Sequence, residues 1–193
     1  MHHIYHTEGF ILESHNFGEV GKYYHIFTRD LGMIMASAQG VRKLSSKLRY
    51  VLQDFTYVKI DLVRGKDFWR VTSASKTNKL ENIKNRPENL RVFANVSRLL
   101  KRLLAGEDAN EDLFIDLINC FFVLEKSEDS KDIQNIEAVI VLRILNKLGY
   151  IGEDEKLANL IVSPFGENIV FEAAKKRRSI LSEINKALRE SNL

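Results

Sequence analysis

The hydrophobic period of this chain changes near residue 85, from about two residues before that point to about 3.6 residues after it. A period of two is typical of strands with one buried face, whereas a period of 3.6 is typical of helices with a buried stripe. Strands therefore precede helices, which predicts an α+β protein and not alternating βαβ units. We expect two domains, residues 1–80 and residues 81–193, packed beside each other.

Five extended segments are predicted in the first 80 residues, separated by turns rich in Gly, Asn and Asp. They cover residues 8–14, 22–28, 33–39, 55–62 and 68–75. The alternation is clearest in the fourth segment, where Val58 and Ile60 take one side and Tyr57 and Lys59 take the other. Five short strands are too few for an immunoglobulin-like sandwich. They suit a five-stranded barrel of the OB type, because near-closure removes exposed sheet edges.

The rest of the chain predicts a helical domain. Pro87 suits the first turn of a helix. The apolar stripe of that helix is formed by Leu90, Phe93, Ala94, Leu100, Leu103 and Leu104. Asn110 can cap a second helix, a third runs over residues 132–148, and a final helix covers residues 173–190. Residues 157–172 remain ambiguous between two short apolar runs and a turn.

Composition limits the kind of protein this is. The single cysteine, Cys120, permits no internal disulfide, and no stretch approaches the roughly 18 apolar residues that cross a bilayer. We therefore expect a cytoplasmic protein without a membrane segment. The sequence has no phosphate-binding Gly-x-x-x-x-Gly-Lys loop, no Gly-x-Ser-x-Gly elbow and no Cys-x-x-Cys pair. We expect no enzymatic activity, with a buried and inert thiol at Cys120 because it shares a helical face with Leu117 and Phe121.

All five histidines lie in the first 25 residues: His2, His3, His6, His15 and His25. Three of them sit at the amino terminus, where a frayed segment does not hold the anchored ligands that a structural metal site needs. We therefore predict no metal and no cofactor.

Positive charge is concentrated in the first 80 residues, which hold 12 Lys or Arg against 7 Asp or Glu, whereas the remaining residues hold 17 against 19. Residues 40–49 place Arg42, Lys43, Lys47 and Arg49 within eight positions, without an acid, directly after a predicted strand. Hydroxyls such as Ser46 and the glycine before them allow the backbone to approach a phosphate closely. This basic loop (residues 40–49) predicts a cradle for a nucleic-acid backbone; the alternative is a solvated connection.

Other candidate contacts lie on predicted strands and on the last helix. Tyr57, Lys59, Phe68 and Arg70 face outward if their neighbours fill the barrel, and Tyr57 and Phe68 would then offer rings for base stacking. Residues 175–178 (Lys175, Lys176, Arg177 and Arg178) form a second basic run, predicted to open the last helix. Cations there would oppose the helix dipole, so an acidic partner is expected, first within the chain and second in DNA.

Several ordered motifs resemble the front domain of the RecO family. They are Gly9-Phe10-Ile11-Leu12, Gly18-Glu19, Ile26-Phe27-Thr28-Arg29-Asp30-Leu31-Gly32, Ala38-Gln39-Gly40-Val41-Arg42-Lys43, Ser46 and Leu52-Gln53-Asp54-Phe55. The segments Leu113-Phe114, Leu142-Arg143-Ile144-Leu145 and Leu148-Gly149-Tyr150 resemble the helical domain of that family. The resemblance covers most of the chain, and its last 40 residues least.

The resemblance implies an OB-fold domain followed by a helical domain, and work in recombinational repair. That work is binding of single- and double-stranded DNA, annealing of complementary strands, and loading of recombinase onto strands coated by single-strand-binding protein. The implied partners are RecR and the acidic C-terminal tail of single-strand-binding protein. The motif positions carried over are Arg42, Lys43, Ser46, Lys47 and Arg49.

Two departures from the family pattern are visible. Many members carry a four-cysteine zinc site after the Leu-Gly-Tyr segment, but residues 151–156 here contain no cysteine, so we predict no zinc there. The chain is also shorter than usual for the family. Two alternative functions stay open: an adaptor whose helical domain binds an acidic peptide, and an OB-fold module that binds RNA.

Overall fold

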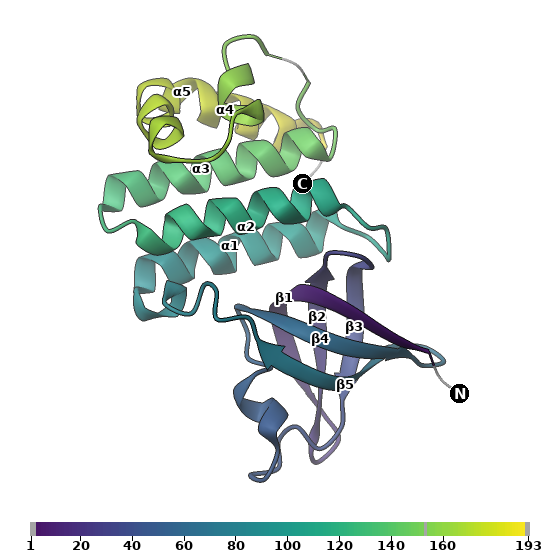
Figure 1. Ribbon diagram of the computed structural model, residues 1–193. Coiled ribbons are helices and arrows are strands. Elements are labelled where there is room, and N and C mark those ends of the chain that lie inside the picture. The colour runs from purple at the N-terminus through teal and green to yellow at the C-terminus, as the bar shows by residue number, and fades with distance from the viewer. Residues whose placement is uncertain (1–2, 153, 192–193) are drawn as a thin grey trace.

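The computed structural model describes residues 3–152 and 154–191, and shows a β-barrel with helices stacked on one side of it (Figure 1). The strands are β1 (Ile4–Phe17), β2 (Gly21–Thr28), β3 (Gly32–Ala38), β4 (Thr56–Arg64) and β5 (Trp69–Lys76). The helices are η1 (Lys47–Tyr50), η2 (Ile83–Asn85), α1 (Pro87–Leu103), α2 (Glu111–Lys126), α3 (Ser130–Lys147), α4 (Ala158–Val162) and α5 (Glu167–Glu190). The five predicted strands are confirmed, with β1 extended at both ends.

The barrel is closed in the order β1-β2-β3-β5-β4, with β4 returning to β1. All neighbouring strands are antiparallel except β3 and β5, which run parallel over the short pairs Ala36–Trp69 and Ser37–Arg70. The barrel is thus joined along most of its seams by long antiparallel ladders, and between β3 and β5 by these two positions alone. The prediction of an α+β protein with a five-stranded barrel of the OB type is confirmed.

Alternation along the strands fills the barrel. Val58, Ile60 and Leu62 on β4 are buried in its interior, as the sequence predicts, and Trp69 on β5 joins them. The complementary outward positions split into two groups. Those beside the helices are apolar, and those elsewhere are polar or aromatic and exposed.

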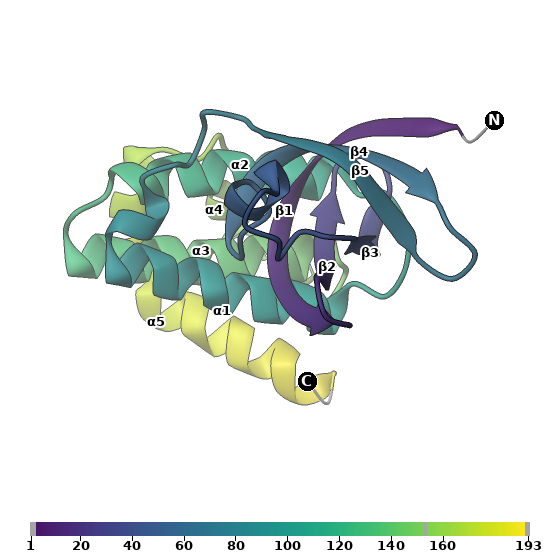
Figure 2. The ribbon, with the colours of Figure 1, turned by 90° about the horizontal axis from the view of Figure 1, so that it is seen from below.

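A second apolar core joins the barrel to α1 and α2. Phe10 on β1 points out of the barrel and contacts Phe93 of α1 and Phe114 of α2, with ring centroids 5.8 and 5.1 Å apart. Phe93 in turn packs on Phe121 at 4.4 Å. Figure 2 shows α1 and α2 running across this side of the barrel. The helices α1 and α2 therefore cover one face of the barrel.

The helical part is layered, with α3 lying between α1 and α2 on one side and α4 and α5 on the other (Figure 1). Because both of its sides are covered, α3 is apolar around most of its surface. Asn110 caps α2 as predicted, with its side-chain oxygen accepting a hydrogen bond from the Leu113 amide at 3.0 Å. The boundary between the two predicted domains, residues 1–80 and 81–193, stays a prediction.

The connection between α1 and α2 presses on the turn between β2 and β3. The Met33 amide donates to the Gly106 carbonyl at 3.1 Å. Gly32 has a φ of +67°, and a Cβ at this position would lie 2.3 Å from the Asp108 carbonyl oxygen. Only glycine allows this backbone conformation and this close approach together.

Two helix predictions need correction. The last helix begins at Glu167 and not at residue 173, because Ile169 and Val170 are buried together with Ala173 and continue its apolar stripe. On α1 the deeply buried positions include Val92 and Val96, whereas Leu90 and Ala94 are only half-buried. The sequence therefore predicts this helix correctly but assigns some of its buried positions to the wrong residues. No helix in the described part of the chain is both long and apolar enough to span a membrane.

Candidate nucleic-acid interface

The basic loop projects from the barrel on the side away from the helices (Figure 1). Val41 and Leu52 at its two ends are buried in the barrel core and anchor it. Between these anchors, Gly40 has a φ of +67°, and amide-to-carbonyl bonds from Lys43 to Gly40 and from Ser46 to Lys43 form successive turns. These turns lead into η1, whose short 3₁₀ geometry holds the end of the loop compact.

The loop cations point to solvent. Arg42, Lys43, Lys47 and Arg49 are all exposed, and Ser46 is half-buried. Within residues 3–152 and 154–191, none of the four cations forms an ion pair. The Arg42 guanidinium donates one hydrogen bond, to the Gly18 carbonyl at 3.3 Å, which ties the loop to the β1–β2 turn. Their charge is therefore available to an anionic ligand.

A hollow of about 580 Å³ opens beside the loop. Its polar lining consists of Lys22, Tyr24, Arg42, Arg49, Tyr50, Gln53 and Asp54. The Tyr24 hydroxyl and one Asp54 carboxylate oxygen are buried, and neither has a hydrogen-bond partner in the described part of the chain. Burial, followed by the negative charge of Asp54, raises the pKa of Tyr24 above its ordinary value, so this hydroxyl remains a donor. Unpaired buried polar atoms are costly, and a ligand in the hollow can satisfy them.

A second hollow of about 310 Å³ continues from the first, and Tyr50 and Gln53 line both. It adds Lys76, Lys79 and Lys84, from the end of β5 and the connection to α1. Burial lowers the pKa of Lys84, and the charge of Lys76 acts in the same direction while Asp54 opposes it. This crowding of cations extends the positive surface beyond the predicted loop.

Three aromatic rings form a row on the outer face of the barrel, which we call the aromatic row (Phe17, Tyr23 and Phe68). Phe17 and Tyr23 lie 4.4 Å apart between ring centroids, and Tyr23 and Phe68 lie 5.0 Å apart. Phe17 is 52% exposed and Phe68 is 40% exposed. Phe17 ends β1 directly before the turn that the Arg42 side chain contacts, so the row adjoins the basic loop.

Tyr57 does not offer a stacking surface, and that prediction is wrong. Its side chain does point away from the barrel interior, but α1 and α2 cover it, and the residue is 4% exposed. Its hydroxyl donates to the Glu8 carboxylate at 2.5 Å. The sequence pattern identifies the outward face of β4 but not the helices that bury it.

Lys59 and Arg70 are both exposed, but only one lies near the aromatic row. Arg70 on β5 pairs with Ser37 on β3, and Ser37 pairs with Tyr23 on β2, so Arg70 and Tyr23 lie on one outer face. Lys59 lines a separate hollow together with the carboxylates of Glu8, Asp30 and Asp61. The structure therefore brings Arg70, but not Lys59, to the same surface as the aromatic row.

The second basic run lies in the third turn of α5, not in its first turn, because the helix begins at Glu167. It therefore carries no penalty from the helix dipole at that end. Lys176 donates to Glu172 at 2.6 Å, and Arg177 donates to Asn135 at 2.8 Å. The Lys175 ammonium lies 4.2 Å from the centroid of the Phe171 ring, whereas Arg178 is exposed. Three of these four cations thus contact side chains of the protein itself, two by hydrogen bonds and one over an aromatic ring.

Two other predicted features can be placed. Cys120 is 1% exposed, and burial raises the pKa of its thiol well above the ordinary value, as expected for an inert core residue. Of the amino-terminal histidines, His6 on β1 pairs with Asp61 on β4 at 2.6 Å, and His3 lies edge-to-face against Tyr5. His2 lies outside the described residues, as does Glu153 in the segment where zinc was excluded.

Sequence reasoning identified Phe68 as a stacking candidate but missed Lys22, Tyr50 and the other two rings of the aromatic row. Tyr50 was detectable in part because it directly follows the basic loop, and Phe17 because it lies in a predicted turn. Their assembly depends on strand pairing, which brings β2 and the β4–β5 loop together and is not visible in a local pattern.

Family models match most of the chain. The model described as "Recombination protein O N terminal" matches residues 1–79, and the model described as "Recombination protein O C terminal" matches residues 85–152. Similar proteins include the DNA repair protein RecO of Rubrobacter xylanophilus, 27% identical over 147 residues, which is 76% of this chain and 58% of that protein. The DNA repair protein RecO of Heliobacterium modesticaldum is 28% identical over 150 residues, which is 78% of this chain and 53% of that protein. The DNA repair protein RecO of Clostridium novyi is 24% identical over 153 residues, which is 79% of this chain and 59% of that protein.

The chain spans between about half and three-fifths of the length of these curated relatives. The two matched models nevertheless follow each other in order, over the barrel and over the first helices. The chain therefore belongs to the RecO family of DNA repair proteins.

Proposed function

We propose that this protein binds single- and double-stranded DNA through its barrel and promotes the pairing of complementary strands, without catalysing a covalent reaction. The observation that carries this proposal is the basic loop, whose four exposed cations form no ion pair within the described residues. Cations in this state bind phosphates and release condensed counterions, which is the main source of affinity for DNA.

Single-stranded DNA would use the aromatic row as well as the loop. OB folds bind oligonucleotides on the face of strands 2 and 3 and on the loops that join strands 1 to 2 and 4 to 5. Phe17 ends strand 1 at the first of these loops, Tyr23 lies on strand 2, and Phe68 lies in the second loop. Exposed rings stack on bases of any sequence, so binding without sequence preference follows. A duplex keeps its bases stacked internally and would contact mainly the cations.

The hollow beside the loop fits one nucleotide of a strand that crosses the interface. Arg42 and Arg49 line it and would hold a phosphate, and the Tyr24 hydroxyl would donate a hydrogen bond to an oxygen of the nucleotide. The buried Asp54 oxygen would accept a hydrogen bond from a base amino group. This pairing satisfies both atoms that lack a partner in the described residues.

Annealing requires only that two phosphate backbones be neutralised and that bases stay free to pair, so it needs no nucleophile, ATP or metal. We propose further that the protein helps to load recombinase onto strands coated by single-strand-binding protein. A RecR-type partner and the acidic C-terminal tail of single-strand-binding protein are the partners that this role requires. The helical part would supply these contacts, because its outer layers lie away from the basic loop (Figure 1).

The test is the salt dependence of DNA binding by a variant in which Arg42, Lys43, Lys47 and Arg49 are all alanine. Each lost single-strand phosphate contact reduces the log–log slope by about 0.7, so four lost contacts reduce it by up to about 2.8. The control variant replaces four exposed cations of the helical part, which are Lys126, Lys131, Lys186 and Arg189. Both variants change the formal net charge from +3 to −1, so their difference reports position and not total charge.

We expect the loop variant to bind a labelled oligothymidine more weakly and with a flatter slope, while the control variant keeps most of the wild-type slope. Equal slopes for the loop variant and the wild type would eliminate the loop as the DNA contact. The same preparations in a strand-annealing assay would show whether pairing depends on the loop.

A second candidate function, a peptide-binding adaptor, has one observation in its favour. A hollow of about 700 Å³ lies between α2, α3 and the segment after α4, and combines apolar Phe122 and Phe165 with the exposed cation Lys147. An acidic peptide with apolar side chains suits such a lining. Binding of a labelled single-strand-binding protein tail, with no affinity for DNA at low salt, would favour the adaptor. Competition of RNA against DNA for the wild-type protein tests the remaining alternative, an RNA-binding module.

A further inference from the structure

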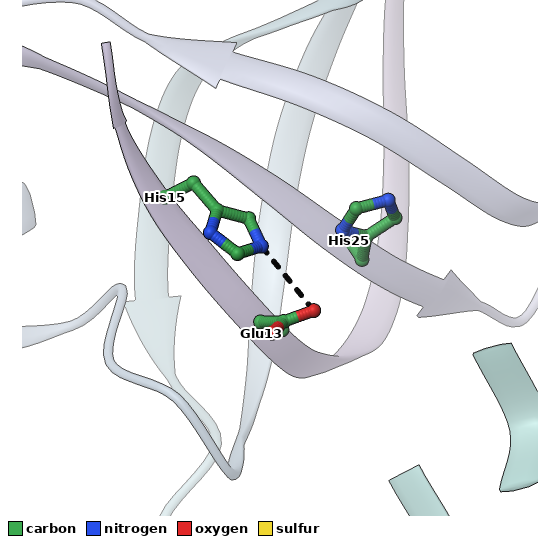
Figure 3. A group of neighbouring side chains, drawn as sticks. All are labelled: Glu13, His15 and His25. Carbon is green, nitrogen blue, oxygen red and sulfur yellow. Dashed lines mark ion pairs between the residues drawn. The ribbon is translucent and has the colours of Figure 1, made fainter. Parts of the chain in front are cut away.

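Three side chains with metal-binding atoms meet on the outer face of the β1–β2 ladder (Figure 3). Glu13 and His15 are two positions apart on β1, so they lie on the same face of the strand, and His25 on β2 is the direct cross-strand partner of Glu13. One ligand atom from each residue lies within 4.8 Å of the other two. Figure 3 shows the two imidazole rings on either side of the carboxylate.

The spacing of these atoms is close to that of a metal-bound set. Zinc binds imidazole nitrogen and carboxylate oxygen at about 2.0–2.2 Å with tetrahedral angles, which places neighbouring ligand atoms about 3.3–3.5 Å apart. His15 Nε2 and Glu13 Oε2 are already 3.3 Å apart. Side-chain rotation of His25 would complete the set, and a water molecule would occupy the fourth position.

His25 is prepared for this role by its surroundings. It is half-buried, and its Nδ1 atom is buried without a hydrogen-bond partner in the described part of the chain. The rings of His15 and His25 lie 6.2 Å apart in an edge-to-face arrangement, which leaves space between them for the ion.

One cation opposes metal binding at this place. The Lys101 ammonium, which belongs to α1, forms an ion pair with the same Glu13 carboxylate. Lys101 pairs with Oε2, the oxygen that lies 3.3 Å from His15 Nε2. A dication must therefore displace Lys101 from this atom or bind the other carboxylate oxygen. Lys101 is partly exposed, so it can turn toward solvent when the ion binds.

We propose that Glu13, His15 and His25 bind one divalent transition-metal ion of the zinc type, and that Lys101 lowers the affinity by competing for Glu13. The ion would join β1 to β2 next to the seam between the barrel and α1. The prediction of no metal considered the amino-terminal histidines. It did not take account of the pairing of β1 with β2, which brings His15 and His25 together.

The amino-terminal histidines are a competing source of metal binding and must be removed first. The background for every measurement is therefore the full chain with His2, His3 and His6 replaced by alanine. Metal-depleted protein is titrated with Co²⁺, whose visible absorption reports a tetrahedral site, and Zn²⁺ is then added to displace it. We expect one ion per chain, and an increase in melting temperature with Zn²⁺ because the ion binds only the folded pair of strands.

The decisive variants are His15→Ala and His25→Ala, each expected to weaken Zn²⁺ binding by at least about tenfold and to abolish the increase in melting temperature. His15 is 59% exposed in its side chain, so its replacement leaves the fold intact, which circular dichroism verifies. Lys101→Met is expected to tighten binding, by about tenfold, because it removes the opposing charge. Lys126→Met, which removes an exposed cation from α2, is the matched control and should change nothing.

Wild-type affinity and stoichiometry in the His15→Ala variant would overturn the proposal, and so would a background protein that binds no Co²⁺ or Zn²⁺ at all. Unchanged affinity in the Lys101→Met variant would refute the role of Lys101. None of these readings depends on DNA binding, so failure here leaves the proposed function to its own test.

Discussion

Replacing two rings of the aromatic row tests whether that row stacks on DNA bases. The change is Phe17→Leu together with Phe68→Leu, which keeps apolar area on the barrel but removes both π-faces. The two rings are 52% and 40% exposed, so each has a free surface for a base, whereas Tyr23 between them is half-buried and is left in place to preserve packing. Each base stacked on a ring contributes about 1–3 kcal/mol.

At the lower end of that range, two lost rings cost about 2 kcal/mol, which is a reduction in affinity of roughly 30-fold. Because no cation changes, the log–log salt slope should stay at its wild-type value. Affinity for duplex DNA should change much less, since paired bases do not reach the rings. The assay is fluorescence anisotropy with a labelled oligothymidine and with a duplex of equal length, each over a salt series.

The matched control is Phe171→Leu, which removes a ring that is 65% exposed on α5, far from the barrel. It should leave both affinities unchanged. The stacking argument fails if the double variant binds oligothymidine as tightly as the wild type, or if it loses single-strand and duplex affinity equally.

Three further predictions concern stability. Gly32→Ala should lower the free energy of unfolding by about 2–4 kcal/mol in a urea titration, because the φ of Gly32 is +67° and a Cβ would lie 2.3 Å from a backbone oxygen. An unchanged midpoint would show that the α1–α2 connection is not held against this turn. Arg143→Met should lower the free energy of unfolding by about 3–5 kcal/mol, since Arg143 is 3% exposed and donates hydrogen bonds to Asp116 at 2.7 Å and to two backbone carbonyls. A loss below about 1 kcal/mol would contradict a stabilising role of the buried Arg143–Asp116 pair. Burial raises the pKa of Tyr57 above its ordinary value of 10.0, so the folded state holds this proton more tightly and the free energy of unfolding should fall as the pH rises above about 10. Tyr57→Phe should reduce that fall. An alkaline stability profile identical to that of the wild type would refute the assignment to Tyr57.

The fold was predictable because its signals are local. Strict alternation on β4 identifies the barrel face of Val58 and Ile60, and an Asn before an apolar run identifies the start of α2. The start of α5 was missed because a Ser-Pro-Phe-Gly turn directly precedes it, and a short apolar run after such a turn does not distinguish the end of a loop from a first helical turn.

The candidate site was predictable only where charge is clustered along the chain. The basic loop satisfies this condition, since its four cations lie within eight residues and their exposure depends on the buried anchors at its ends. The prediction for Tyr57 was wrong because a side chain that points away from the barrel interior is still buried when helices cover that face of the strand. Phe68 alone of the aromatic row was a candidate from the sequence. The assembly of the row and of the Glu13–His15–His25 group could not be predicted, since strand pairing brings them together from separate segments.

The most direct measurement of the central claim is photocrosslinking of the protein to an oligothymidine that carries iodinated bases, followed by identification of the crosslinked peptides. Crosslinks should fall on Phe17, Tyr23, Tyr50 and Phe68, and the variant without the four loop cations should crosslink far less at the same salt concentration. Crosslinks confined to α5 and the residues around Arg178, with the barrel unmarked, would contradict the account.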